Sequence, residues 1–180
     1  MKLFKSLSIA LLATTLLSVA CTPTRTQKSA GEQIDDAVVL TKVKAALVAD
    51  PVAEAHEINV EVFRGIVQLN GFVGSSVEKA RAAKVARGVG GVKEVQNNLA
   101  VKQEGTSIGE VIDDATVTAK IKAALIESSR TKAYQIKVET KDGAVQLSGF
   151  VNDASAKAAA SEIAHSVAGV RSVANNIDVK

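Results

Sequence analysis

The sequence Val-Gln-Leu-Asn-Gly-Phe-Val at residues 67–73 returns, with one substitution, as Val-Gln-Leu-Ser-Gly-Phe-Val at residues 145–151. The second copy lies 78 positions after the first. With the same shift, residues 31–102 align without a gap on residues 109–180. A repeat of this length predicts a duplicated domain, and therefore two small cores in place of one large core.

Each repeat opens with a predicted amphipathic helix. The sequence Ile-Asp-Asp-Ala precedes apolar residues at helical spacing in both copies. We expect Asp35 or Asp36 to cap the first helix, and Asp113 or Asp114 to cap its counterpart, because a carboxylate accepts hydrogen bonds from the free amides of a first turn. The same role explains these acidic pairs without a bound cation.

The rest of each repeat reads as a hairpin, a second helix and a last strand. Arg64-Gly65 and Asp142-Gly143 each lie between two alternating apolar runs, which is the pattern of a tight hairpin. Ser75 is followed three residues later by a glutamate, as in a capping box, and Asp153 can cap the equivalent helix. The predicted fold class is α+β, with two tandem α-β-β-α-β domains that each pack a three-stranded sheet on two helices.

The first 30 residues have the pattern of an export signal. A basic start and an apolar run at residues 7–17 precede Ser18-Val19-Ala20 and Cys21, the only cysteine. The stretch before Cys21 resembles the lipobox of bacterial lipoproteins, with Ser18 where that motif usually has leucine. We therefore expect a signal peptide at residues 1–20, a covalent lipid on Cys21 and a flexible tether over residues 21–30. Ordinary secretory cleavage, which would release a soluble periplasmic protein, is the alternative.

The repeated motifs resemble those of the BON domain. The resemblance rests on the Ile-Asp-Asp start, on the Gly65-x-Val67-x-Leu69-x-Gly71 hairpin and on the close of each repeat at Gly91-Val92-x-x-Val95-x-Asn97. It implies a first domain at residues 31–102, a linker at residues 103–108 and a second domain at residues 109–180. It also implies phospholipid binding, a role in envelope integrity under osmotic stress, and contact with outer-membrane assembly or cell-wall machinery. Because Thr22 follows the cysteine, the resemblance favours the periplasmic face of the outer membrane.

Charge and composition argue against several other functions. Of the 22 basic residues, Lys2 and Lys5 lie in the predicted signal peptide, and the remainder nearly balance 19 acidic residues without a basic stripe. The chain also has no Trp and one Tyr, so we expect no nucleic-acid partner. The two histidines, His56 and His165, occupy non-equivalent positions of the two repeats. We therefore predict no enzyme activity, no metal site and no cofactor beyond the lipid.

Contact with an anionic phospholipid surface is the function that the remaining residues favour. Basic residues lie on and just after the first helix of the second repeat, whereas the first repeat has Asp50, Glu54 and Glu57 in that region. The candidate lipid-contact residues are Lys120, Lys122, Arg130 and Lys132, with Ile126 and Tyr134 as interfacial side chains. A chaperone-like or protein-interaction module without lipid affinity is the alternative function.

Overall fold

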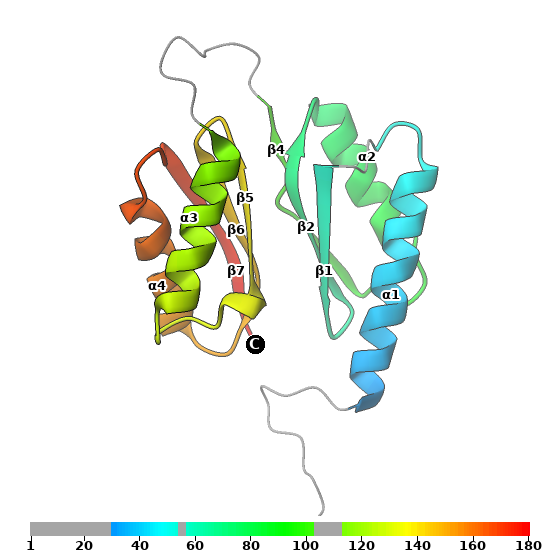
Figure 1. The fold of residues 1–180 in the computed structure, drawn as a ribbon. Coiled ribbons are helices and arrows are strands. Elements are labelled where there is room, and N and C mark those ends of the chain that lie inside the picture. Colours follow the sequence, from blue (N-terminus) through cyan, green and yellow to red (C-terminus); the bar gives the residue numbers. More distant parts are fainter. Residues whose placement is uncertain (1–29, 54–56, 103–112) are drawn as a thin grey trace, which may run out of the picture.

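A computed structural model describes residues 30–53, 57–102 and 113–180 (Figure 1). The predicted signal peptide, Cys21 and His56 lie outside these residues. The first repeat contains α1 (Ala30–Ala49), β1 (Ile58–Phe63), β2 (Ile66–Val73), α2 (Ser76–Arg87), β3 (Glu94–Asn97) and β4 (Ala100–Val101). The second contains α3 (Asp114–Glu127), the 3₁₀-helix η2 (Ala133–Gln135), β5 (Ile136–Lys141), β6 (Ala144–Val151), α4 (Ala154–Ser166) and β7 (Ser172–Val179).

The two repeats have the same sheet topology. In each repeat the hairpin is antiparallel, and the last strand pairs in parallel with the second strand of that hairpin. In the first repeat this last strand is interrupted between β3 and β4. Both pieces keep one register, since Leu69 pairs with Asn97 and Phe72 with Ala100. The predicted α+β fold with two α-β-β-α-β domains is confirmed.

Each repeat has its own apolar core between its helices and one face of its sheet. In the first, Val43 and Leu47 of α1 pack with Val67 and Leu69 of β2. Equivalent residues, 78 positions later, form the second core, and they include Ile121, Leu125, Val145 and Leu147. The alternation along the central strands therefore sends Val67 and Leu69 toward the helices and the residues between them toward the opposite face.

The acidic pair of the first repeat has a different role from the one predicted. Helix α1 begins at Ala30, so Asp35 and Asp36 lie inside it and do not cap it. The buried carboxylate of Asp36 instead accepts hydrogen bonds from the backbone amides of Arg64 and Gly65, at 2.8 and 2.9 Å. Both turn residues have positive φ, so their amides point away from the hairpin ladder and need an acceptor elsewhere.

The second repeat uses its acidic pair for both purposes. Asp113 caps α3, as predicted, by accepting from the amides of Ala115 and Thr116. The Thr116 hydroxyl also donates to this carboxylate, which lowers the pKa of Asp113 below its usual value. Asp114 accepts from the two amides of the turn at Asp142-Gly143, at 2.7 and 2.9 Å. The second acidic residue of each pair therefore connects the first helix to the tip of the hairpin.

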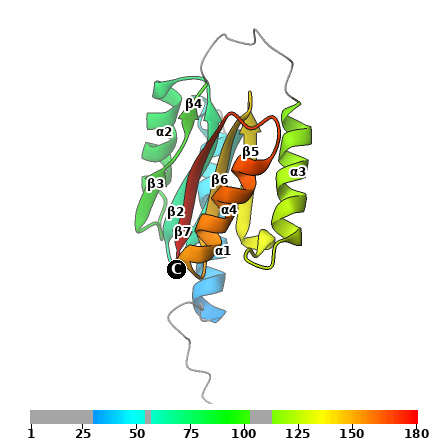
Figure 2. The ribbon, with the colours of Figure 1, turned by 90° about the vertical axis from the view of Figure 1, so that its left-hand side faces the viewer.

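The two domains pack sheet against sheet, with their helices on the outside. Figure 1 shows α3 and α4 on one side, α1 and α2 on the other, and the two sheets between them. The turned view in Figure 2 shows β7 passing beside β2 of the other sheet. The face of each sheet that its own helices leave uncovered is therefore covered by the other repeat.

Candidate functional site

The interface between the sheets is lined by buried polar side chains. We call the residues that meet here the interdomain face. Gln68 and Asn70 of β2 are fully buried, and Gln146 and Ser148 of β6 are at most 4% exposed. Buried amides need hydrogen-bond partners, so their contacts decide how the domains fit together.

Two reciprocal hydrogen bonds cross the interdomain face. Oε1 of Gln68 accepts from the backbone amide of Gly149 at 3.1 Å, and Oε1 of Gln146 accepts from the amide of Gly71 at 2.8 Å. The shift of 78 positions turns one of these bonds into the other. We call them the Gln–Gly pairs. They show that the two repeats are related by an approximate twofold axis.

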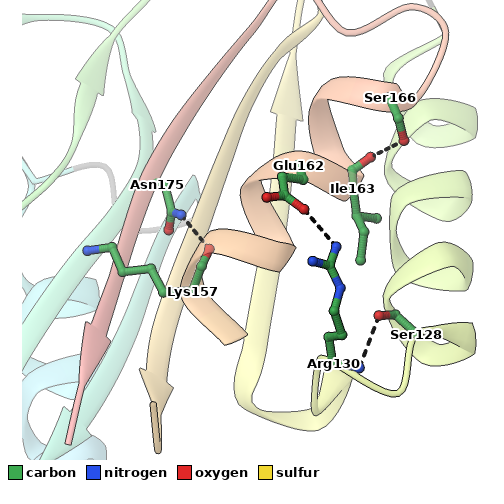
Figure 3. Close-up of polar contacts among 7 residues, drawn as sticks. All are labelled: Ser128, Arg130, Lys157, Glu162, Ile163, Ser166 and Asn175. Atoms are coloured by element: carbon green, nitrogen blue, oxygen red, sulfur yellow. Dashed lines mark hydrogen bonds and ion pairs between the residues drawn. The ribbon is translucent and has the colours of Figure 1, made fainter. Parts of the chain in front are cut away.

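The amide nitrogen of each glutamine side chain also makes a reciprocal hydrogen bond. Nε2 of Gln68 donates to the carbonyl of Asn176 at 3.3 Å, and Nε2 of Gln146 donates to the carbonyl of Asn98 at 3.2 Å. The asparagine before each of these residues has a different role. Asn175 donates from Nδ2 to the carbonyl of Lys157 at 2.8 Å (Figure 3), and the first repeat has the same bond in the equivalent place. The repeated Asn-Asn sequence thus connects the last strand to a helix and to the other domain.

Three contacts at the interdomain face are not symmetric. Nε2 of Gln68 also donates to Oδ2 of Asp178 at 2.9 Å, where the first repeat has Ala100 in the equivalent place. The ring of Phe63 stacks on that of Phe150, with centroids 5.2 Å apart. The ammonium of Lys180 lies over the same Phe63 ring. The face is therefore specific for a first repeat against a second repeat.

A groove of about 690 Å³ lies at the end of α3, between that helix and η2. Two large apolar side chains at its rim are exposed to solvent, Ile126 by 73% and Tyr134 by 80%. The hydroxyl of Thr131 donates to the carbonyl of Leu125 at 2.6 Å and holds the connecting loop against the helix. The groove is lined by Lys122, Leu125, Ile126, Thr131, Lys132, Ala133, Tyr134, Ile136 and Lys137.

The structure divides the predicted lipid-contact residues into two sets. Lys122, Ile126, Lys132 and Tyr134 line the groove together. Lys120 does not, because two positions along a helix is a rotation of about 200°.

Arg130 lies outside the groove as well. Its guanidinium pairs with the carboxylate of Glu162 on α4 at 2.7 Å (Figure 3). Lys137, on the other hand, lines the groove and was not among the predicted residues. It lies in β5, next to buried Ile136, and the sequence gives no sign that this strand approaches the end of α3.

The equivalent positions of the first repeat carry a different charge. Shifting the three groove lysines back by 78 positions gives Lys44, Glu54 and Asn59. The second repeat therefore has three positive charges where the first has one positive and one negative charge. Of the two repeats, only the second combines apolar side chains with a net positive charge at this place in the sequence.

The described part of the chain contains no group of residues arranged to bind a metal ion. Within residues 30–53, 57–102 and 113–180, no three His, Cys, Asp or Glu side chains are grouped so that they could hold a metal ion. His165 is exposed on the last turn of α4. Among the same residues, no helix is both long and apolar enough to cross a membrane.

Comparison with known proteins agrees with the duplicated fold. The model of the BON domain matches residues 35–103 and again residues 113–180. Osmotically-inducible protein Y of Escherichia coli is 41% identical over 83% of this chain and 75% of its own. Outer membrane lipoprotein DolP of Haemophilus influenzae and a 21 kDa hemolysin of Actinobacillus pleuropneumoniae are each 35% identical, over 81% of this chain and 75% of their own.

Proposed function

The chain belongs to the BON domain family, and from this premise we propose that it is a lipid-anchored periplasmic protein that contacts anionic phospholipid and supports outer-membrane integrity under stress. Its relatives include an osmotically inducible protein and an outer membrane lipoprotein. The observation that carries the lipid contact is the groove at the end of α3. It joins exposed Ile126 and Tyr134 to three lysines on one surface.

This combination of side chains suits the interface of a membrane. Apolar side chains gain free energy by entering the boundary between headgroups and acyl chains, and each lysine near an anionic surface adds about 1 kcal/mol. Neither contribution is large alone. A covalent anchor that keeps the chain at the surface makes such a weak contact effective, because the second contact then becomes intramolecular.

The position of the groove agrees with an anchor near the N-terminus. In both views the start of α1 and the end of α3 with η2 lie at the same end of the molecule (Figures 1 and 2). Eight residues lie between Cys21 and Ala30, which allows a maximum reach of about 30 Å. An anchor at Cys21 would therefore hold the membrane at the same end of the molecule as the groove, which supports the proposed contact.

Charge reversal in the groove is expected to weaken vesicle binding by about a hundredfold or more. The variant combines Lys122→Glu, Lys132→Glu and Lys137→Glu, and removes three contributions of about 1 kcal/mol each. The measurement is co-sedimentation of the unlipidated protein with vesicles containing phosphatidylglycerol, over a range of salt concentrations.

A matched control reverses three bases outside the groove, with Lys44→Glu, Lys84→Glu and Arg171→Glu. It changes the net charge equally, and we expect its vesicle affinity to stay within about threefold of the parent. Equal losses in the two variants would show that net charge alone, and not the groove, determines lipid binding.

The anchor is tested separately by the mass of the mature protein. We expect the protein from a membrane fraction to begin at Cys21 and to carry acyl chains, and the variant Cys21→Ala to appear unmodified in the soluble periplasmic extract. An unmodified parent protein in the soluble extract would contradict the anchor. A soluble module that interacts with other proteins would then be the better description.

A further inference from the structure

We propose that the interdomain face is also an interaction surface for a second copy of this chain, so that two chains can exchange repeats. In the exchanged dimer the first repeat of each chain packs on the second repeat of the other. The Gln–Gly pairs join residues 68 and 149, and residues 146 and 71, whichever chain supplies them. The dimer therefore contains the same contacts as the closed monomer, twice.

The face can open without unfolding either domain. Each repeat keeps its apolar core on the other side of its sheet, between the sheet and its own helices. The interdomain face consists largely of hydrogen-bonded polar side chains, as in associations between domains that are already folded. Exchange then costs only the contacts of the face, and the dimer restores them.

One buried group on the face favours opening. Oδ1 of Asn70 accepts from Nδ2 of Asn98 at 3.2 Å, but Nδ2 of Asn70 is buried without a hydrogen-bond partner in the described structure. Removing such a donor from water without compensation is unfavourable. In the open chain this amide is solvated, so the closed monomer is less stable than its other hydrogen bonds suggest.

The asymmetric contacts determine which repeats pair. A first repeat against another first repeat would place Ala100 where Asp178 accepts from Gln68. Each first repeat therefore prefers a second repeat, and two chains satisfy both preferences by closing into a twofold dimer. This arrangement leaves no unpaired face for a third chain.

Concentration decides between the monomer and the dimer. The covalent link keeps the repeats of one chain at an effective concentration in the millimolar range, so the monomer dominates in dilute solution. Chains crowded on one membrane, as our proposed function requires, reach concentrations at which exchange competes. An exchanged dimer there presents two grooves to the surface.

Complementation between two blocked variants tests the exchange in the absence of lipid, and therefore independently of membrane binding. The first variant carries Gln68→Arg and Asn70→Arg, which block the face of the first repeat. The second carries Gln146→Arg and Ser148→Arg, which block the face of the second repeat. Both are made as the mature chain with Cys21→Ala.

We expect each variant alone to be a monomer with the circular dichroism of the parent, since it has no complementary pair of intact faces. In an equimolar mixture, the second variant supplies an intact face on its first repeat, and the first variant supplies an intact face on its second repeat. The mass from light scattering is then expected to double at a protein concentration of about 100 μM. This is below the millimolar effective concentration at which the covalent link holds the two repeats of one chain. A mixture that stays monomeric would overturn the proposal.

If either blocked variant fails to fold, isotope labelling of the chain without the arginine substitutions tests whether two chains exchange repeats. The ¹⁵N-labelled and unlabelled forms are concentrated together to about 1 mM and examined by native mass spectrometry. We expect a dimer that contains one chain of each kind, and a share that rises with concentration. The absence of this mixed dimer at every concentration would equally overturn the exchange.

Discussion

Replacing Gly71 or Gly149 with alanine is expected to unfold the repeat that carries the substitution. Both glycines have a strongly positive φ, at 119° and 123°, where a side chain is strained. An added Cβ would also overlap a backbone carbonyl oxygen of the neighbouring strand region, that of Glu57 for Gly71 and that of Gln135 for Gly149. A backbone atom in a sheet cannot move aside as the end of a flexible side chain can.

The energy involved is comparable to the stability of one repeat. A domain of about 70 residues is stable by roughly 4–10 kcal/mol, and backbone strain combined with overpacking removes several kcal/mol. Urea unfolding followed by circular dichroism is expected to show a transition of smaller amplitude than that of the parent, because only the intact repeat still unfolds, and hydrogen exchange identifies the repeat that has already unfolded.

Gly90→Ala is the matched control for this prediction. Its φ is not in the positive range, and nothing lies within 4 Å of a Cβ built there. We expect its unfolding curve to match that of the parent within about 0.5 kcal/mol. A parent-like curve for Gly71→Ala would mean that the close approach to Glu57 is not maintained in solution.

Removing both glutamines of the interdomain face is expected to separate the unfolding of the two domains. In the variant with Gln68→Ala and Gln146→Ala, the amides of Gly149 and Gly71 lose their acceptors. Each buried amide left without a partner costs about 1–3 kcal/mol, so the double variant loses about 2–6 kcal/mol of interdomain stability.

The measurement is urea unfolding of the double variant beside Gln96→Ala. Gln96 is a partly buried glutamine of the same sheet whose side chain accepts one longer bond, from Gln68 at 3.3 Å. We expect the control to lose less than about 1 kcal/mol. A double variant that unfolds in one transition at the midpoint of the parent would contradict the coupling role of the Gln–Gly pairs.

The sequence predicts the local structure of each repeat well, because the relevant signals are local. Alternating apolar residues and the turn at Arg64-Gly65 define the hairpin, while Ser75 and Asp153 cap their helices as expected. Asp36 shows the limit of this reasoning. Its acceptor role depends on amides 28 and 29 residues away, and a carboxylate near a helix start gives no sign of that partner.

The candidate sites also combine contacts that local spacing predicts with contacts that only the tertiary structure reveals. Lys122 and Ile126 are four positions apart on one helix, so their proximity can be predicted from spacing. Lys137 lines the groove because β5 packs near the end of α3, and the spacing of residues along the sequence does not predict this tertiary contact. Gln68 and Gln146 have the alternation of solvent-exposed strand residues, because the face on which each lies is covered only by the other domain. The sign available in the sequence was that both glutamines recur inside the most closely repeated stretch.

The antiparallel packing of the repeats gives the duplication an evolutionary consequence. Helices α1 and α3 run in opposite directions, so their C-terminal ends lie at opposite ends of the molecule (Figures 1 and 2). After duplication the two copies of one surface no longer shared an environment. The two copies differ in charge accordingly, with Lys132 and Lys137 in the second repeat and Glu54 and Asn59 at the equivalent positions of the first.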